Sequence, residues 1–475
     1  MNADVDLLAS SFVSGRLRDP ETTVEVRDPF RGDVVGRAAV SDGVDLDDVV
    51  DAAVRASAVM AAMPGYERAA LLRRAADATE AAQDRIGLVM ARETGKALRD
   101  CVVEVARSAD TLRLAAEEAV RITGEHVPMD ASPIGAGKLA LTTRFPIGVV
   151  AAITPFNGPI NLAAHKVGPA LAAGNSVVLK PSPKAPLSSH LFAAALQEAG
   201  VPDGALGTLY GDAVSARLVS DSRVDFVSFT GSIPVGRAIH AAVGLKRVAL
   251  ELGGVGPTFV HHDSDLVEAA RACARNGVLL AGQSCVSVQN VYVQASRVEE
   301  FTALLDSEVA SIRFGDPLDP DTEVGTLIDE AAALRVEGLV NRAVAARAQV
   351  VRHGERTGAA LRATILTSVD QSMEVVRDEV FGPVITVQPY EDIESVIATI
   401  NASPYGLQCG VFTNSIDVAH RVYKTLRTGG VIVNATSRWR SDQMPYGGVK
   451  DSGIGREGPR FAIREMTDER LLVIA

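Results

Sequence analysis

Cys285 lies in a local sequence that would let a substrate approach its thiol. It follows Gly282, Gln283 and Ser284, where an apolar helical segment is expected to break. Glycine allows a ligand to come close to the backbone, and an ionised thiol is a strong nucleophile. Taken alone, the segment favours the ordinary alternative, because free cysteines usually pack as small buried hydrophobic residues. Catalysis by Cys285 would need a base and an oxyanion donor from elsewhere in the chain.

Glu251 and Asn157 could supply that base and that donor. Glu251 ends an apolar segment, and a buried carboxyl is costly unless it is paired, or neutral with a raised pKa. A raised pKa would suit a general base near neutral pH, whereas a structural ion pair is the alternative. Asn157 lies between Pro155 and Pro159, which would hold its amide as a rigid donor to a developing oxyanion. Forming a turn or a cap is its ordinary role.

The segment 147–254 would position both of these side chains. Short apolar strands alternate there with helical segments, a pattern that predicts a parallel, doubly wound α/β sheet. Such sheets bind ligands at the carboxyl ends of their strands. The candidate ligand-binding positions are therefore the residues at and after those ends: Thr154, Pro155, Lys180, Ser182, Lys184, Gly211, Thr230, Gly231 and Ser232.

Two motifs could bind phosphate, and their contexts differ. In SFTGSIPVG a strand ends, Thr230–Ser232 turns, and Pro234 opens a helix. The amides of that helix start could hold a pyrophosphate, although a plain strand–turn–helix with a serine cap fits equally well. Residues 453–458 match GxGxxG letter for letter, but a glycine-rich loop precedes them instead of a strand. That context disfavours a dinucleotide fingerprint.

The rest of the chain divides into segments of different character. Residues 46–119 predict three amphipathic helices, and residues 123–145 predict a β-hairpin with a glycine-rich turn. Residues 255–435 repeat the alternation of strands and helices and contain Cys285. The apolar C-terminal residues 470–475 predict a strand that joins another sheet. A chain of 475 residues is expected to form two or three domains.

Composition excludes several classes of protein. The net charge of −12 disfavours nucleic acid and anionic membranes as partners. The four cysteines form no CxxC pair and no histidine cluster has metal spacing, so we expect reduced thiols and no metal site. The start of the chain lacks the basic and apolar regions of a secretory signal, and no apolar run is long enough to span a bilayer. We therefore expect a cytoplasmic protein.

Seven motifs occur in order along the chain and together are specific. They are PFN at 155–157, KPS at 180–182, FTGS at 229–232, ELGG at 251–254, GQSC at 282–285, EVFGPV at 379–384 and YGGVKDSGIGREG at 446–458. With these motifs the chain resembles the NAD(P)-dependent aldehyde dehydrogenase superfamily over nearly its whole length. KPSPKAPLS, VSVQNVYV and MPYGGVKDSGIGREG are most similar to the lactaldehyde and phosphonoacetaldehyde dehydrogenase-like branch.

The resemblance implies an α/β fold in three parts. A Rossmann-type coenzyme domain would comprise 1–122 and 146–251, and an α/β catalytic domain 252–440. A small β oligomerisation element, 123–145 and 441–475, would assemble a homodimer or homotetramer.

The resemblance also implies a covalent mechanism with NAD or NADP. Cys285 would attack a small aldehyde, and Asn157 and the Cys285 N–H would hold the oxyanion. Hydride transfer would leave a thioester, which Glu251 would hydrolyse by activating water. The coenzyme would be held by Lys180 and Glu379 at the riboses, Phe381 beside the nicotinamide, and Ser232 with its loop at the pyrophosphate.

Two departures from the family bear on coenzyme preference. Many NAD-specific members carry a glutamate where this chain has Pro183, followed by Lys184. Loss of that acid removes repulsion against a 2′-phosphate, so we expect NADP to be tolerated and the preference stays open. The loop Gly211-Asp212-Ala213-Val214 also replaces the usual glycine-rich stretch, so the adenine end would be held differently.

The substrate is only indicated by charged residues near the predicted entrance. Arg440 and Arg107 would suit a short aldehyde that carries an anion, and surface or interface arginines are an equal alternative. Ser284 stands before the nucleophile, where a phosphonoacetaldehyde dehydrogenase would be expected to have an arginine.

Two other functions stay in view. A CoA-acylating semialdehyde dehydrogenase usually lacks the ELGG glutamate, so Glu251 argues against it. A non-catalytic binding protein on the same fold is disfavoured by the presence of Cys285, Glu251 and Asn157 together.

Overall fold

Five apolar strands form a parallel sheet whose carboxyl ends meet at one edge. The computed structural model describes residues 7–475. The sheet has the order β10-β9-β8-β11-β12-β22, in which β22 alone is antiparallel. Its strands are β8 (Val149–Ile153), β9 (Ser176–Lys180), β10 (Leu206–Thr208), β11 (Phe226–Thr230), β12 (Arg247–Glu251) and β22 (Gly453–Ile454). Every residue of β8, β9 and β11 is buried, as expected for strands covered on both faces.

Helices cover both faces of this sheet. Val150 and Ala152 pack into the core that contains α4, α5 and α6, whereas Val149, Ala151 and Ile153 pack against α1, α7 and α8. This alternation follows from the two-residue period of a strand and confirms the doubly wound arrangement. The helices are α1 (Gly43–Ala62), α4 (Leu98–Ala119), α5 (Pro159–Ala173), α6 (Pro186–Glu198), α7 (Ser215–Ser220) and α8 (Ile233–Ala242).

The N-terminal segment forms four helices, so the prediction of three was wrong. The expected middle helix divides at Ala82 into α2 (Gly65–Ala81) and α3 (Gln83–Thr94). Neither glycine nor proline marks the break, and the apolar spacing continues across it, so local pattern could not place it. Before these helices, β1 (Leu8–Ala9), β4 (Thr23–Arg27) and β5 (Val34–Ala39) form a small sheet.

A second α/β unit follows, with the strand order β15-β18-β19-β14-β13-β20-β21. Its six parallel strands are the six that the sequence predicted. The antiparallel edge strand β15 was missed, because its residues are mostly exposed and lack a continuous apolar run. The strands are β13 (Thr258–Val260), β14 (Asn290–Gln294), β15 (Gln349–Arg352), β18 (Thr364–Thr367), β19 (Val384–Tyr390), β20 (Gln408–Phe412) and β21 (Gly430–Val433). Among its helices are α9 (Leu266–Val278), α11 (Glu330–Ala345), α13 (Ile393–Ala402) and α14 (Ile416–Thr425).

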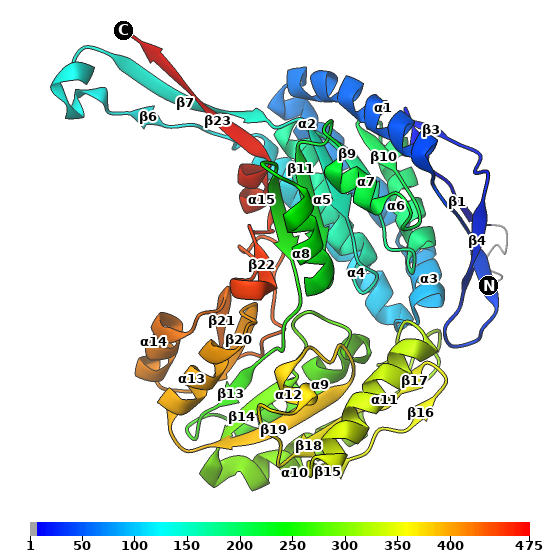
Figure 1. Ribbon diagram of the computed structural model, residues 1–475, viewed down its shortest axis with the longest axis vertical. Coiled ribbons are helices and arrows are strands. Elements are labelled where there is room, and N and C mark those ends of the chain that lie inside the picture. The colour runs from blue at the N-terminus through cyan, green and yellow to red at the C-terminus, as the bar shows by residue number, and fades with distance from the viewer. Residues whose placement is uncertain (1–6) are drawn as a thin grey trace.

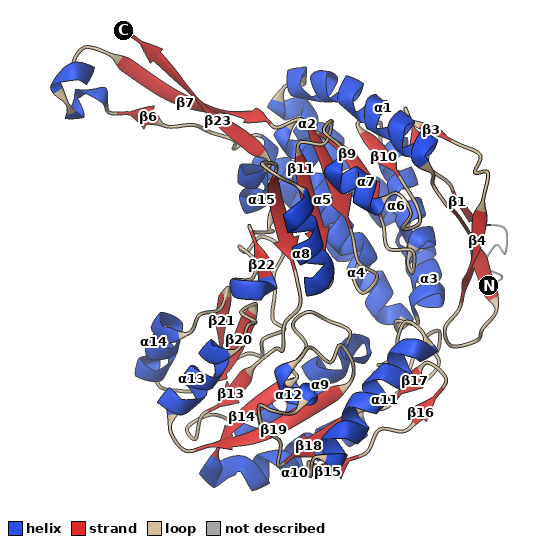
Figure 2. Cartoon of the chain, in the orientation of Figure 1, coloured by secondary structure: helices blue, strands red, loops and turns tan. Residues whose placement is uncertain are grey.

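The two sheets occupy separate halves of the molecule (Figure 1), with helices around each sheet (Figure 2). The C-terminal segment returns from the second half to the first, where α15 (Pro459–Glu465) packs against α5. No helix among residues 7–475 has the length and apolar character needed to cross a membrane.

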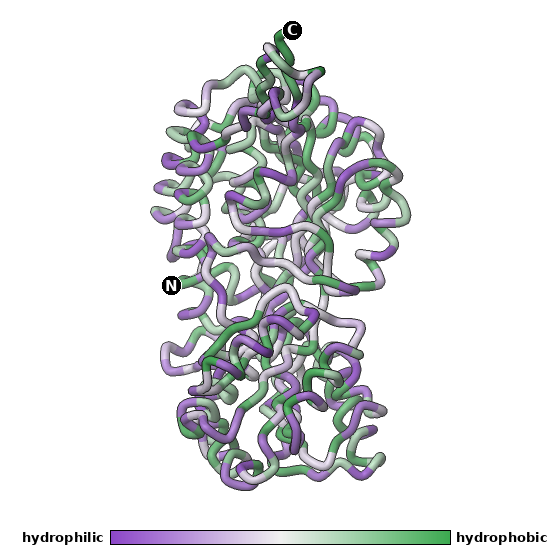
Figure 3. Tube along the Cα trace, turned by 90° about the vertical axis from the view of Figure 1, so that its left-hand side faces the viewer, coloured by the Kyte–Doolittle hydropathy of each residue, from purple (hydrophilic) through white to green (hydrophobic). Residues whose placement is uncertain are grey.

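A three-stranded arm projects from the half that contains the six-stranded sheet (Figure 1). It consists of β6 (His126–Val127), β7 (Leu139–Pro146) and β23 (Thr467–Ile474) in the order β23-β7-β6. The predicted hairpin is present, although two short 3₁₀ turns occupy its connection. The C-terminal strand pairs antiparallel along the whole of β7, which confirms that it joins another sheet. Leu471, Leu472 and Ile474 are exposed, and the apolar end of the chain lies at the tip (Figure 3).

Candidate active site

A strained turn brings Cys285 to the space between the two halves. Helix α9 ends at Val278, earlier than the expected break at Gly282. Leu280 and Ala281 then adopt left-handed conformations, with φ of 58° and 52°, which non-glycine residues rarely do. Gly282 has φ of 71°, and a Cβ at this position would collide with the Gly382 backbone. Such strain is typical of functional sites.

The Cys285 thiol contacts a tyrosine hydroxyl. Its Sγ lies 3.2 Å from the Tyr446 oxygen. Burial raises the pKa of the thiol to about 11, and the Tyr446 hydrogen bond opposes this shift. The thiol is therefore neutral at pH 7 and must lose its proton before or during attack.

Asn157, which follows β8, is hydrogen-bonded to the turn that carries Cys285. Its Nδ2 donates to the main-chain oxygen of Gln283 at 2.8 Å. Asn157, Ser284 and Cys285 line one cavity of about 460 Å³, a size that suits a small molecule. The main-chain N–H of Cys285 donates to no acceptor within residues 7–475, which leaves it available for an oxyanion.

Glu251 is buried at the end of β12 without a hydrogen-bond partner. Both of its carboxyl oxygens are unsatisfied within the described residues. Burial raises its pKa well above the usual value, and the nearby charge of Glu457 raises it further. A Cβ at Gly447 would stand 2.7 Å from Glu251 Oε1, so glycine there lets the loop pass close to the carboxyl. A buried, unpartnered carboxyl with a raised pKa is a candidate general base.

Glu457 is a buried carboxylate that the sequence did not single out. It accepts hydrogen bonds from Lys166 Nζ at 3.0 Å and from Arg440 Nη2 at 3.1 Å. Burial opposes its ionisation, but Lys166 and Arg440 outweigh burial and lower its pKa. Glu457 lies inside the GxGxxG match, and that pattern drew attention to the glycines instead of the acid. Its negative charge adds to the effect of burial in raising the pKa of Glu251.

The two arginines predicted to bind substrate line the cavity but already have carboxylate partners. Arg440 pairs with Glu457, and its guanidinium carbon lies 3.8 Å from the centre of the Tyr446 ring. Arg107 pairs with Asp442 at 2.7 Å. Asp442 also accepts from His165 Nε2 at 3.0 Å, which fixes it against α5. The prediction that Arg440 and Arg107 contact substrate stays a prediction.

The other predicted residues meet at the carboxyl edge of the six-stranded sheet. Lys180 is the last residue of β9, is buried, and pairs with Asp212. The Thr154 and Thr230 hydroxyls are buried without a partner within residues 7–475. Such orphaned donors fit a polar ligand in this cleft.

The turns at this edge fit a dinucleotide as well. The Gly231 N–H donates to the Glu251 main-chain oxygen at 3.0 Å, and Ser232 stands at the start of α8 without capping it. Gly211 has φ of 79°, which favours glycine. Ser182 Oγ accepts from the Lys184 N–H at 3.2 Å, and Lys184 Nζ pairs with Asp329 at 3.0 Å. Pro155 follows Thr154 at the end of β8.

Glu379 and Phe381 reach this edge from the second half of the molecule. Glu379 accepts a hydrogen bond from the Gly254 N–H at 3.2 Å, close to Glu251 in the chain. Burial raises the pKa of Glu379 to about 7. Phe381 has a left-handed φ of 48° and packs edge-on against Phe156 at 6.0 Å between ring centres. The two halves therefore meet around the predicted nicotinamide position.

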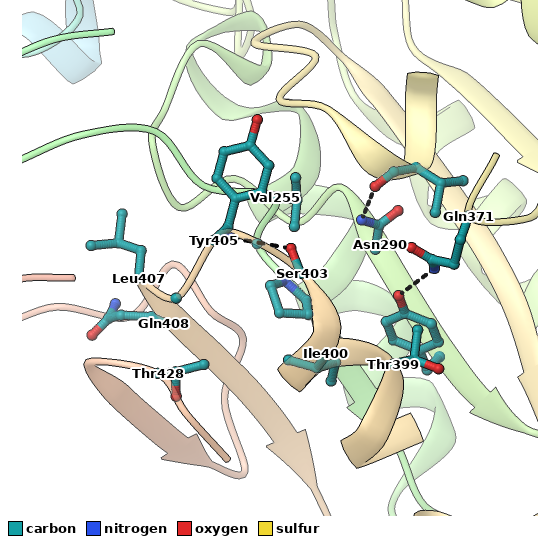
Figure 4. A pocket seen from close by; sticks show the side chains of 15 residues that line it. Val255, Asn290, Gln371, Thr399, Ile400, Ser403, Tyr405, Leu407, Gln408 and Thr428 are labelled. Carbon is teal, nitrogen blue, oxygen red and sulfur yellow. Dashed lines mark hydrogen bonds between the residues drawn. The ribbon is translucent and has the colours of Figure 1, made fainter. Parts of the chain in front are cut away.

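A second, smaller cavity lies within the seven-stranded half (Figure 4). It measures about 20 Å³, enough for one water molecule. Tyr405 lines it, and the Tyr405 oxygen accepts a hydrogen bond from the Glu379 N–H at 3.3 Å. Gln371 Nε2 donates to the Tyr292 oxygen at 3.3 Å on its far side. Its lining includes neither Cys285 nor Asn157, so it is separate from the cavity that contains the thiol.

Comparison with known proteins identifies the class to which this fold and site belong. Residues 17–472 match the model of the aldehyde dehydrogenase family. The chain therefore belongs to the aldehyde dehydrogenase family, as the motifs predicted. It is an NAD(P)-dependent enzyme that oxidises small aldehydes.

Several relatives and solved structures align along nearly the whole chain. A 3-sulfolactaldehyde dehydrogenase of Priestia aryabhattai is 42% identical, covering 98% of this chain and 97% of its own. A lactaldehyde dehydrogenase of Methanococcus maripaludis is 35% identical, covering 98% and 99%. The structure of an NADP-dependent glyceraldehyde-3-phosphate dehydrogenase from Bacillus halodurans, complexed with NADP, matches with a TM-score of 0.95 and 33% identity, covering 98% and 99%.

Proposed function

We propose that this enzyme oxidises a short anionic 2-hydroxyaldehyde, of the class of 3-sulfolactaldehyde, to its carboxylic acid. The observation that carries the proposal is a single cavity in which Cys285 and Asn157 lie beside three arginines, Arg107, Arg438 and Arg440. The lining also contains Lys96 and the carboxylates Asp100, Glu104 and Glu268. The support therefore comes from the guanidinium groups themselves, which favour an anionic group beside them. The sulfolactaldehyde and lactaldehyde dehydrogenases among the relatives support this substrate class.

In the first step, the Cys285 sulfur would form a bond to the aldehyde carbon while the C=O π pair moves onto the oxygen, and the thiol proton would pass to a water molecule. The Asn157 amide and the free Cys285 N–H would donate to the oxygen as it gains negative charge. Because the thiol has a pKa of about 11, loss of its proton is part of the work of this step. The Tyr446 hydroxyl, 3.2 Å from Sγ, is placed to donate to the thiolate as it forms.

NAD or NADP, when bound, supplies the hydride acceptor that converts the thiohemiacetal to a thioester. Lys180 and Glu379 would hold its riboses, and Phe381 would flank the nicotinamide. Around them, the remaining positions of the cleft would be Thr154, Pro155, Ser182, Lys184, Gly211, Thr230, Gly231 and Ser232.

In the last step, Glu251 would take a proton from water, whose oxygen then bonds to the thioester carbon and releases the thiolate. Glu251 is the candidate because it is buried, unpartnered and carries a raised pKa. This step distinguishes the proposal from CoA-dependent acylation, in which a thiol cofactor would attack instead of water.

The test of this function is formation of NADH or NADPH with a panel of short aldehydes. We expect the highest kcat/KM for 3-sulfolactaldehyde, a lower value for the uncharged lactaldehyde, and free acid as the product. Absence of turnover with every aldehyde would contradict the function. Acyl-CoA formation when CoA is added would favour the alternative activity.

Asp212 is a candidate determinant of the preference for NAD over NADP. Its carboxylate pairs with Lys180, so it holds negative charge near the predicted ribose site. We expect Asp212→Asn to raise kcat/KM for NADP relative to NAD by roughly 3- to 10-fold, because repulsion of a 2′-phosphate is removed. The matched control is Asp130→Asn on the exposed arm. An unchanged coenzyme ratio would show that Asp212 does not sense the 2′ position.

We propose that the arm is the surface through which chains assemble into the predicted homodimer or homotetramer. Its last strand leaves Leu471, Leu472 and Ile474 exposed, and an apolar strand of this kind favours pairing with another chain. We expect the double variant Leu472→Asp/Ile474→Asp to reduce the mass measured by light scattering to that of a smaller species. Ile416→Asp, an equally apolar exposed position on α14, should leave the mass unchanged. If the arm variant keeps the wild-type mass, assembly uses another surface.

A further inference from the structure

The three cavity arginines differ in whether a protein carboxylate neutralises them. Arg107 pairs with Asp442, and Arg440 pairs with Glu457. Arg438 makes no salt bridge with any of residues 7–475, and its Nε is buried without a hydrogen bond. Arg438 is therefore the one of the three whose charge is left for something else in the cavity.

The backbone around Arg438 is held firmly and lies next to the nucleophile. The Ser437 hydroxyl lies within hydrogen-bond distance of the main-chain oxygens of Gly256 and Val286, at 3.2 and 2.9 Å, and Val286 directly follows Cys285. Gln408 Nε2 donates to the main-chain oxygens of Ser437 and Trp439, at 2.8 and 3.2 Å. These contacts fix the backbone from which the Arg438 side chain extends, and this removes part of the entropic cost of binding.

Arg438 makes no salt bridge with a carboxylate among residues 7–475, although Asp100 lies near enough to affect its pKa. Burial lowers the pKa of Arg438, Asp100 acts in the opposite direction, and Arg107 lowers the pKa further. Asp100 also lines the cavity, but it makes no salt bridge or hydrogen bond with Arg438. Arginine stays protonated in proteins, so Arg438 is a cation of the cavity that has no directly bonded carboxylate among residues 7–475. A desolvated cation of this kind interacts strongly with an incoming anion.

We propose that Arg438 binds the anionic group of the substrate and sets the preference for anionic over neutral aldehydes, while Arg107 and Arg440 position neighbouring loops. This inference rests on the proposed function. The planar guanidinium would accommodate a sulfonate, carboxylate or phosphonate through two parallel hydrogen bonds. Arg440 instead holds Glu457 in its ionised form, and Arg107 anchors Asp442.

The first test compares Arg438→Gln with wild type on 3-sulfolactaldehyde, a carboxylate-bearing aldehyde and neutral lactaldehyde. Hydrogen bonds to charged groups contribute enough to predict a loss of roughly 10- to 100-fold in kcat/KM for the anionic aldehydes. The neutral aldehyde should change by less than about 3-fold, because it has no anionic group for the Arg438 guanidinium to bind. Arg438→Lys should recover part of the loss, and a larger loss for one anion identifies the anion that the site accepts.

The matched control is Arg99→Gln. Arg99 is exposed on α4 and pairs with Glu323 outside the cavity, so this exchange should leave both kinds of substrate unaffected. An equal loss on anionic and neutral aldehydes in Arg438→Gln would overturn the proposal, since it would indicate a structural role. Unchanged kcat/KM for anions in Arg438→Gln would overturn it as well.

A second test measures binding without turnover. Trp439 is the only tryptophan of the chain and lines the same cavity, so its fluorescence reports on ligands beside Arg438. We expect 3-hydroxypropane-1-sulfonate to produce a saturable change in wild type and Arg99→Gln, and at least roughly 10-fold weaker binding in Arg438→Gln. Equal affinity in all three proteins would contradict the proposal. This titration tests Arg438 even if no aldehyde is turned over, an outcome that would contradict only the proposed function.

Discussion

Replacing Cys285 with serine is expected to lower kcat by roughly 10⁴-fold or more, because loss of a covalent nucleophile removes the whole catalytic route. Serine preserves the size of the side chain and its contact with Tyr446, so the cavity should keep its shape. A serine hydroxyl is far less acidic than a thiol, and no base stands within hydrogen-bond distance of Cys285 Sγ among residues 7–475. The measurement is the rate of NADH or NADPH formation at saturating aldehyde.

Alkylation provides the control for this variant. Cys101, Cys273 and Cys409 are fully buried, whereas Cys285 is partly accessible. Iodoacetamide should therefore add one label per chain to wild type and none to Cys285→Ser, as measured by mass spectrometry. The thiol pKa is about 11 in the coenzyme-free enzyme. Because only the thiolate reacts, the labelling rate should still be rising with pH above 9. Turnover or labelling retained by Cys285→Ser would contradict the assignment.

Replacing Glu251 with glutamine is expected to slow thioester hydrolysis by roughly 10²- to 10⁴-fold, the usual contribution of a general base. Attack by Cys285 and hydride transfer do not need this carboxylate in the same way. The variant should therefore release about one NADH or NADPH per active site in a rapid burst, followed by slow turnover. Stopped-flow absorbance at the coenzyme band would resolve the two phases.

The pH dependence of hydrolysis gives a second check on Glu251. Burial and Glu457 raise its pKa, so the fraction of Glu251 that is ionised and able to act as a base should increase as pH rises through that raised pKa. Deacylation in wild type should increase with pH, and this increase should disappear in Glu251→Gln. Glu330→Gln, which removes an exposed carboxylate paired with Arg356, is the matched control. A wild-type rate of steady-state turnover in Glu251→Gln would contradict its role.

The sequence predicted the elements of the fold that depend on local pattern. The strands of both sheets other than β15 and β22 were found because buried parallel strands are continuous apolar runs, and Lys180, Thr230 and Glu251 each end one of them. The two-residue strand β22 lies in a glycine-rich stretch for which no strand was predicted. The break at Ala82 and the edge strand β15 were not found. At Ala82 the apolar spacing does not change, and in β15 the exposed residues carry no run.

The candidate site residues Cys285, Asn157 and Glu251 were chosen from residue type and motif, and their catalytic roles stay predictions. The charge pairing of the site was not predictable from the sequence. Glu457 meets Lys166 across 291 residues of sequence, and no local pattern indicates that Arg440 turns towards the same carboxylate.

The sequence by itself therefore determined the family and the strand ends, and it predicted the candidate reacting side chains, because periodicity and motif are properties of neighbouring residues. Only the tertiary structure decided which of the three arginines keeps an unpaired charge in the cavity. Ion pairs depend on distances of a few ångströms between segments that are far apart in the chain. Arg438 and Arg440 are two residues apart and chemically identical, and only their surroundings in the fold distinguish them.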